Sequence, residues 1–323
     1  MLSLWKGKKM SKYVVVGAGA TGSGVATLLS NQGHQVEVVT RSGSGPIREG
    51  VTLRSGDATN AEFLSSVSAG AAAIFNCANP PYHRWLTDWP PLADSLLIAA
   101  QNGGATLVTL SNLYAYGQPS GPMTPHDPLK STLPKSMVRA KMWNDALALH
   151  EAGKIQAVEV RASDFIGDSP QSQFAYFLPR LLKGKNLQVL GDPDAVHTWS
   201  YVGDVARTLV AVAQNSNTWG RAWHVPSNEP RSARQVFNEL ADVAGVARTK
   251  ISSIPTPVLR LVGIVNPQMR ELLKTLYQFQ SPFVMEDKES REVLGIEPTS
   301  WDLILSDTLR PYLSKTSAHS KDN

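Results

Sequence analysis

The sequence predicts an α/β fold in which one parallel sheet is covered by helices on both faces. Three observations predict it. Short apolar segments alternate with helical segments through the first half of the chain. A glycine-rich turn joins the first apolar segment to the first helical one. Several later apolar segments end directly in polar residues, as strands do at the functional edge of such a sheet.

The glycine-rich turn is the strongest single signal. The apolar run 13–16 is too short for anything but a buried strand, and the turn 17–22 reads G-x-G-x-x-G. A helical segment then stops at Gly33, and a second strand is expected over 35–40. Glycines here permit a tight turn, close approach of a pyrophosphate and close helix packing, while free N–H groups of the helix face the phosphate. This predicts a Rossmann dinucleotide site that includes Gly17, Gly19, Ala20, Thr21 and Gly22.

The end of the second strand indicates which dinucleotide binds. An NAD site usually carries Asp or Glu about 20 residues after the glycines, where it holds the ribose 2′-hydroxyl. Here the strand ends without an acid, and Arg41 and Ser42 follow it. An arginine can pair with a 2′-phosphate through its fork of donors, and a serine can add a hydroxyl. The sequence therefore favours NADP(H) over NAD(H).

Composition excludes several classes of protein. The 323 residues are 42% apolar and 18% charged, and no apolar run approaches the ~20 residues of a membrane span. The first residues are too weakly apolar for a signal peptide. The single cysteine, Cys77, excludes an internal disulfide. The seven histidines show no metal-binding spacing, so no metal site is predicted. We expect a cytoplasmic protein that has no membrane partner.

The net charge of +4 is not a sign of nucleic-acid binding. Lys6, Lys8, Lys9 and Lys12 lie in the first dozen residues without an acid, which leaves 31 − 4 = 27 basic against 27 acidic residues. We expect a flexible basic end over 1–11 and a disordered tail over 313–323.

Polar residues follow the next four predicted strands, which are expected over about 51–54, 72–77, 105–110 and 155–161. Ligands of open α/β sheets bind beyond the carboxyl ends of the strands, although about half of such residues serve only to end a strand. The candidates are Asp57, Ala58, Ala78, Asn79, Ser111, Asn112, Ser163 and Asp164.

An aromatic loop follows the fourth strand. The segment 79–85 contains two prolines together with Tyr82, His83 and Trp85. A rigid loop at this edge is suited to lining a substrate pocket, and it is equally suited to fixing the start of the next helix.

The second half of the chain lacks the regular alternation of strands and helices seen in the first half. Short strands are expected near 187–190 and 223–225, an amphipathic helix over 232–245, and an apolar, proline-bounded segment over 255–267 that could cover a pocket. We therefore divide the chain into a nucleotide-binding domain over 12–165, which also receives strands from the later region, and a smaller α/β substrate region over 166–312.

These marks together resemble the extended short-chain dehydrogenases/reductases, the superfamily of NAD-dependent epimerase/dehydratase proteins. The resemblance covers roughly residues 12–312. It rests on GAGATG at 17–22, Gly-Asp-Ala at 56–58, SNLYAYG at 111–117, the segment 161–167 and YVGDVA at 201–206. It implies that Asp57 contacts adenine, that Ala78 and Asn79 border the cofactor, and that Ser163, Asp164 and Phe165 border the nicotinamide end. It is also compatible with a homodimer.

The superfamily's reaction uses Ser or Thr together with Tyr-x-x-x-Lys on one helix. Lys141 lies 141 − 116 = 25 residues after Tyr116, where the resemblance places the lysine that holds the cofactor and assists catalysis. Met137 then stands at the tyrosine position, and methionine cannot transfer a proton. The best match to the serine is Asn112, with Ser111 beside it.

The missing tyrosine leaves three alternatives. Lys141 alone acts as the acid/base, a relocated phenol of Tyr114, Tyr116 or Tyr82 supplies the proton, or the chain binds NADP without catalysis. We therefore expect an atypical NADP(H)-dependent oxidoreductase acting on a carbonyl or an activated double bond of a small metabolite. A sugar-nucleotide epimerase/dehydratase is the alternative enzyme, and a redox-sensing regulator is the alternative of another class.

Overall fold

The computed structural model describes residues 10–319 with the exception of residue 171. The greater part of the predicted basic end, residues 1–9, lies outside the described residues, as do the last four residues of the chain.

The centre of the molecule is a seven-stranded sheet in which all neighbouring strands are parallel, as the sequence predicts. Its spatial order is β11-β6-β5-β4-β1-β2-β3, so the chain starts in the middle and winds outward in both directions. Each predicted strand lies within about two residues of its expected position. The strands are β1 (Lys12–Val16), β2 (Gln35–Thr40), β3 (Val51–Ser55), β4 (Ala71–Asn76), β5 (Thr106–Asn112), β6 (Gln156–Ala162) and β11 (Ala222–His224).

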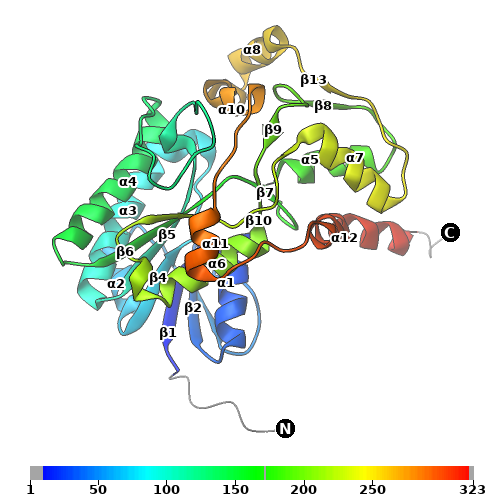
Figure 1. Ribbon diagram of the computed structural model, residues 1–323. Helices are drawn as coiled ribbons and strands as arrows, with labels where there is room; N and C mark the ends of the chain where they lie inside the picture. Colours follow the sequence, from blue (N-terminus) through cyan, green and yellow to red (C-terminus); the bar gives the residue numbers. More distant parts are fainter. Residues whose placement is uncertain (1–9, 171, 320–323) are drawn as a thin grey trace.

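Helices cover both faces of the sheet because its strands are apolar on both sides. Val15 packs into one hydrophobic cluster, with α1 (Ala20–Asn31) and α6 (Val202–Ala213). Val14 and Val16 pack into a second cluster on the opposite face. Figure 1 shows the helices of that face stacked at the left of the sheet. They are α2 (Ala61–Ser68), α3 (Trp85–Gly103) and α4 (Pro134–Glu151).

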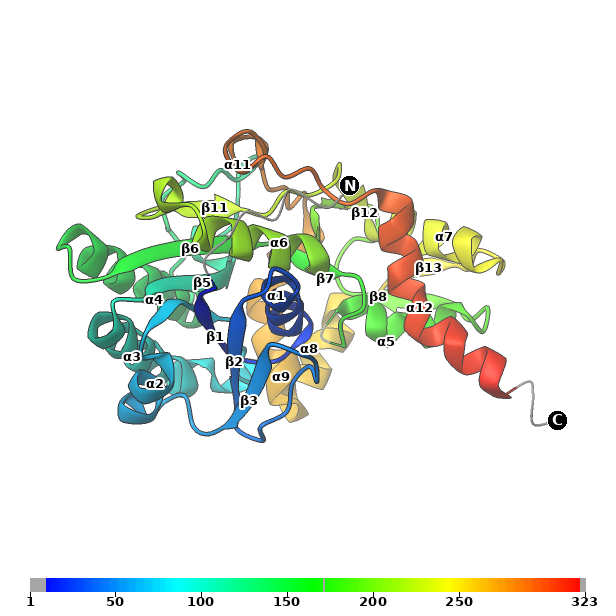
Figure 2. The ribbon, with the colours of Figure 1, turned by 90° about the horizontal axis from the view of Figure 1, so that it is seen from below.

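A smaller region with its own hydrophobic cluster stands beside the sheet. Figure 2 shows three of its helices gathered at one end of the molecule. They are α5 (Gln173–Leu181), α7 (Ala233–Ala244) and α12 (Trp301–His319), and the short strands β8 (Leu187–Val189) and β13 (Ile251–Ser253) pair in parallel beside them. The serine cap predicted for α7 is present, because Ser232 and Gln235 form a reciprocal capping box.

Further short elements connect the two regions. The apolar segment expected to cover a pocket contains α8 (Thr256–Val265), which packs against α9 (Pro267–Leu272), and α10 (Tyr277–Gln280) follows. The remaining elements are η1 (Tyr82–Arg84), η2 (Tyr114–Tyr116), β7 (Asp164–Ile166), β9 (Val196–His197), β10 (Trp199–Tyr201), η3 (Ser216–Thr218), β12 (Arg231–Ser232), η4 (Leu273–Thr275) and α11 (Lys288–Leu294).

The predicted disordered tail requires a correction, because α12 continues to His319 and so includes residues 313–319. A helix that is already anchored gains one hydrogen bond for each residue added, so a polar sequence can extend it. Among the described residues, no helix combines the length and apolar character needed to span a membrane.

Candidate nucleotide and substrate site

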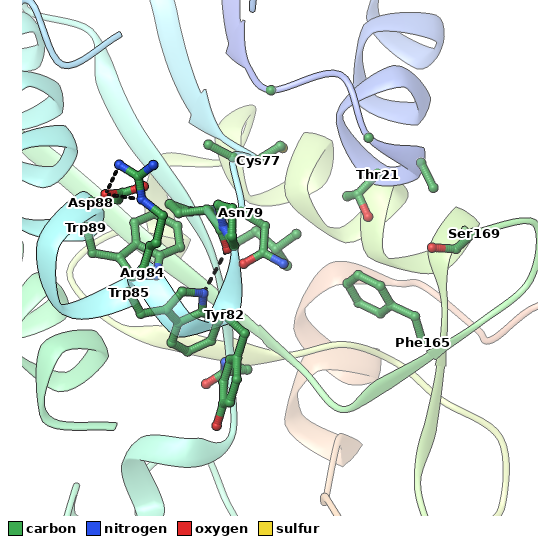
Figure 3. Close-up of a pocket in the computed structure, with 18 of the residues that line it drawn as sticks. Thr21, Cys77, Asn79, Tyr82, Arg84, Trp85, Asp88, Trp89, Phe165 and Ser169 are labelled. Carbon is green, nitrogen blue, oxygen red and sulfur yellow. Dashed lines mark hydrogen bonds and ion pairs between the residues drawn. The ribbon is translucent and has the colours of Figure 1, made fainter. Parts of the chain in front are cut away.

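One large cavity of about 1350 Å³ opens at the carboxyl ends of the sheet strands. It begins at the glycine-rich turn, passes the ends of β4, β5 and β6, and reaches α5, α9 and α10 of the smaller region. Figure 3 shows Thr21, Phe165 and Ser169 on one side of it, and Tyr82 and Trp85 on the other.

The glycines of the turn lie where a side chain could not fit or would block the cavity. Gly17 has a φ of +97°, and a Cβ there would lie 2.8 Å from the backbone nitrogen of Ala78. A Cβ on Gly22 would lie 2.0 Å from the Gly17 oxygen, so α1 sits directly on the turn. Gly19, by contrast, lines the cavity, and no atom lies within 4 Å of the position that a Cβ would take there. Its backbone is therefore open to a ligand.

The start of α1 fits a phosphate group. No side chain caps its N-terminus, and the first turn carries no acid that would compete with an anion. Ala20 and Thr21 line the cavity, and the buried Thr21 hydroxyl has no hydrogen-bond partner among the described residues. These features fit a dinucleotide pyrophosphate at this position, and such a cofactor would supply hydride transfer there.

The glycine-turn end of the cavity also carries a positive and a negative side chain. Arg41, Asp57 and Ala58 all line it. The pKa of Asp57 is lowered, chiefly because the Thr59 N–H donates to its Oδ1 at 2.9 Å, and to a smaller extent because Arg41 is near. Ser42 is placed differently from the sequence-based expectation. Its hydroxyl contacts that of Ser44 at 2.8 Å, and it does not line the cavity.

Aromatic rings form the wall next to β4. Ala78 and Asn79 line the cavity, and the Trp85 indole N–H donates to the carbonyl of Pro80 at 3.0 Å, which fixes the loop. Tyr82 packs edge-on against Trp85, with ring centroids 4.9 Å apart. His83 is the exception among the predicted substrate residues: it is exposed and borders a separate pocket of about 90 Å³.

Tyr114 and Tyr116 point to different places. Both belong to the 3₁₀ turn η2, so the extended geometry that would put them on one face is absent. Tyr114 lines the cavity, and burial, followed by the charge of Asp164, raises its pKa. Tyr116 instead enters a buried network, where it accepts a bond from Arg161 at 2.6 Å and lies 2.8 Å from His224 Nε2. Tyr116 therefore does not line the cavity, and of the three candidate phenols only those of Tyr82 and Tyr114 do.

The register of α4 also differs from the expectation. Met137 and Lys141 face solvent, and Lys141 forms an exposed ion pair with Asp145 at 2.7 Å. Lys141 does not line the cavity. Lys135 and Arg139, two positions earlier and also four residues apart, lie on the buried face. The face of α4 that turns toward the sheet therefore carries Lys135 and Arg139 in place of the expected pair Met137 and Lys141, because counting across a long loop does not fix the helical face.

The two buried cations have distinct partners. Arg139 lines the cavity, donates to the carbonyl of Leu110 at 2.6 Å and stacks over Trp89, and burial lowers its pKa to about 10. Lys135 lies 3.2 Å from Glu271 of α9 and over the ring of Tyr82. Lys135 therefore joins the sheet domain to the covering helices.

The residues after β5 and β6 meet at the cavity, as expected from parallel strands. Ser111, Asn112, Ser163, Asp164 and Phe165 all line it. Sequence reasoning missed the buried cations and the part of the wall that lies beyond the segment 255–267. That wall includes Met269, Leu272, Gln278 and Phe279. Among the described residues, no group of three or more His, Cys, Asp or Glu side chains is arranged to hold a metal ion.

Comparison with protein families identifies the chain's relatives. Residues 13–225 match the model of the NAD dependent epimerase/dehydratase family. The chain belongs to this family. The match confirms the sequence-based resemblance and includes the glycine turn and the strand ends that line the cavity. It agrees with a nicotinamide cofactor at the turn.

Individual relatives are distant. A dTDP-glucose 4,6-dehydratase of an Actinoplanes strain is 26% identical over 145 residues, which are 44% of this chain and 42% of that protein. The match thus spans well under half the length of this curated relative.

Two solved epimerases have the same fold over nearly their whole length. The UDP-glucose 4-epimerase of Thermotoga maritima superposes with a TM-score of 0.78, at 18% identity, over 94% of this chain and 99% of that one. A UDP-N-acetylglucosamine 4-epimerase of Methanobrevibacter ruminantium gives 0.78 at 16% identity, over 95% and 99%. These likenesses establish the fold.

Proposed function

We propose that this chain is an NADP(H)-dependent oxidoreductase that acts on a carbonyl group or an activated double bond of a small metabolite. One observation carries the proposal: a single cavity contains the glycine turn and Arg41 at one end and the phenol of Tyr114 near the other. Its volume of about 1350 Å³ exceeds the ~300–1000 Å³ of ordinary ligand pockets, which leaves room for a dinucleotide and a second small molecule.

The preference for NADP(H) rests on Arg41. β2 ends in Thr40 and Arg41 without a carboxylate that would bind a ribose 2′-hydroxyl. The acid on β2, Glu37, is already paired with Arg54. An arginine at the cavity edge suits a 2′-phosphate, which it can bind through two parallel hydrogen bonds.

Proton transfer is assigned to Tyr114. A phenol is protonated at neutral pH, and Tyr114 lines the cavity, so its O–H is placed to donate a proton to an oxygen that gains electrons. The bound cofactor would supply the hydride. Phe165 and Phe279 would exclude water from that end, and Arg139 adds a fixed positive charge to the wall.

Two further functions remain as alternatives. The names of the relatives favour a sugar-nucleotide epimerase/dehydratase. The buried face of α4, which carries Lys135 and Arg139 and no phenol, favours a redox-sensing regulator that binds NADP without catalysis.

The deciding experiment has two steps. Calorimetry with NADPH, NADP⁺, NADH and NAD⁺ tests binding, and we expect the phosphorylated pair to bind more tightly. NADPH absorbance is then followed with aldehydes, ketones and enones, and UDP- and dTDP-glucose are assayed for epimerised or dehydrated products. Oxidation of NADPH supports the oxidoreductase, and altered sugars support the alternative enzyme. Tight binding with no turnover, together with a partner interaction that distinguishes NADP⁺ from NADPH, supports the regulator.

A further inference from the structure

Asp164 and Tyr114 occupy equivalent places on neighbouring strands. β5 and β6 pair in parallel, and Asn112 lies opposite Ala162. Tyr114 and Asp164 each follow two residues later, and both line the cavity. The carboxylate is close enough for its charge to raise the pKa of the phenol. An acid therefore stands beside the proposed proton donor.

The carboxyl group of Asp164 bridges the cavity and a buried histidine. His197 Nε2 lies 2.8 Å from Asp164 Oδ2, and that oxygen is buried. The rest of the Asp164 side chain is open to the cavity, since 28% of the side chain is exposed, compared with 4% for His197. A proton held by this pair can therefore reach the cavity through Asp164.

Rigid contacts hold the histidine in place. The ring of His197 stacks on Phe279 at 5.7 Å with an interplanar angle of 7°, and it also packs on Trp199 and Phe283. Its Nε2 lies 3.4 Å from the Ser163 hydroxyl. Tyr114 is the titratable group coupled to Asp164 by charge, and Tyr82 and Tyr277 in turn act on Tyr114. Imidazole is the side chain that gains or loses charge most readily near neutral pH.

We propose that Asp164 is a catalytic residue that exchanges the reaction's proton with the substrate end of the cavity, and that His197 is the positioning residue that stores this proton. The proposal rests on the proposed function. In the reducing direction, NADPH held at the glycine turn would supply a hydride to the carbonyl carbon, and Tyr114 would donate a proton to the carbonyl oxygen. Asp164 returns a proton from the His197 side to Tyr114, which leaves an alcohol, NADP⁺ and a deprotonated pair.

Proton counting during cofactor binding tests this without a substrate. Oxidised nicotinamide carries a positive charge and the reduced ring does not, so NADP⁺ should expel a proton from a nearby acid–imidazole pair. Calorimetry in buffers of different ionisation enthalpy, between pH 5 and 8, gives the protons released. We expect greater release with NADP⁺ than with NADPH, and loss of this difference in Asp164→Asn and in His197→Gln. The control is Asp168→Asn, which changes an exposed acid two residues after the end of β7 and should keep the difference.

The possible results separate the two proposals. Equal proton counts for both cofactors, or an unchanged difference in Asp164→Asn, overturn the role of the pair while leaving the oxidoreductase intact. Failure of the wild-type chain to bind either cofactor overturns both. Asp164→Glu keeps a carboxyl group and serves as a control for misfolding of the other variants. It should show part of the difference in proton release between NADP⁺ and NADPH. If Asp164→Glu folds and binds NADP⁺ but shows no such difference, proton exchange by this pair is contradicted.

Discussion

Lys135 and Arg139 lie one helical turn apart on the buried face of α4, and each places its cation on an aromatic ring. The Nζ of Lys135 is 3.7 Å from the centroid of the Tyr82 ring, and the guanidinium carbon of Arg139 is 4.3 Å from that of Trp89. The buried face of α4 thus presents two cations and no phenol. A phenol that donates a proton must come from another element.

Arg139 should therefore matter and Lys141 should not. Arg139→Met leaves the buried carbonyl of Leu110 without its donor, which should cost about 1–3 kcal/mol of unfolding free energy and weaken NADPH binding. Lys141→Met removes an exposed ion pair and should leave both unchanged. Chemical denaturation and calorimetry on the two variants check this. Loss of NADPH binding in Lys141→Met alone would restore the residue's sequence-based role.

Arg41 should set the preference for the 2′-phosphate. Arg41→Ala removes a charge-assisted contact worth about 1.5–3 kcal/mol, so NADPH affinity should fall about tenfold or more while NADH affinity stays constant. Arg48→Ala is the matched control, because Arg48 belongs to the same loop and does not line the cavity. Equal affinities for NADPH and NADH in the wild-type chain would exclude the preference.

Alanine replacements of Gly17 and Gly19 should have different effects, on stability and on cofactor affinity respectively. Gly17→Ala forces a Cβ to within 2.8 Å of backbone at a positive φ, so the variant should unfold at clearly lower temperature. Gly19 has an extended backbone and open space at its Cβ, so Gly19→Ala should fold normally and lose cofactor affinity. Thermal unfolding combined with calorimetry separates the effects. Unimpaired binding by Gly19→Ala would show that no pyrophosphate approaches there.

Replacement of Tyr114 should affect turnover, whereas replacement of Tyr116 should affect stability. Tyr114→Phe should slow NADPH turnover by at least about tenfold, as loss of a positioned acid does. Tyr116→Phe leaves Arg161 and His224 short of a buried partner, so it should lower stability and spare turnover. Turnover and unfolding are measured on both. Full activity of Tyr114→Phe would move the proton donor to Tyr82 or to Asp164.

His224 should make the fold acid-sensitive. Burial lowers its pKa to about 3 from 6.5, so below pH 6.5 the unfolded chain binds a proton that the folded chain refuses. This histidine therefore contributes stability near neutral pH that is lost as pH falls from 6.5 toward 3, at up to about 1.4 kcal/mol per pH unit. Urea denaturation at several pH values should show a shallower loss in His224→Gln than in the wild type. The exposed His83→Gln should follow the wild type.

The sequence predicts what local chemistry determines. The glycine turn, the strand ends and the cap at Ser232 are short-range patterns, and the structure contains all three. The face of α4 is different, because the loop over 117–133 separates it from β5 and packing alone sets its rotation. Lys135 and Arg139 are also charged, and charged residues are almost never expected to be buried, so no sequence pattern marks them.

The directions of Tyr114 and Tyr116 illustrate a second limit. One short turn of 3₁₀ helix separates their side chains, so Tyr116 enters the core and Tyr114 the cavity. The sequence shows two tyrosines in alternation, which suits an extended segment equally well. The sequence does not reveal that residues 114–116 form a 3₁₀ turn, and this conformation decides where each tyrosine points.

The two ends of the cavity differ in how freely they can evolve. At Gly17 and Gly22, an added Cβ would meet backbone atoms at 2.8 and 2.0 Å, so a mutation of either glycine is harmful. The opposite wall comes from α9 and α10, through Met269, Leu272 and Phe279, which the turn does not constrain. Mutation and selection can reshape that wall while the nucleotide end stays fixed. Related chains that accept new substrates should therefore differ most over 256–280.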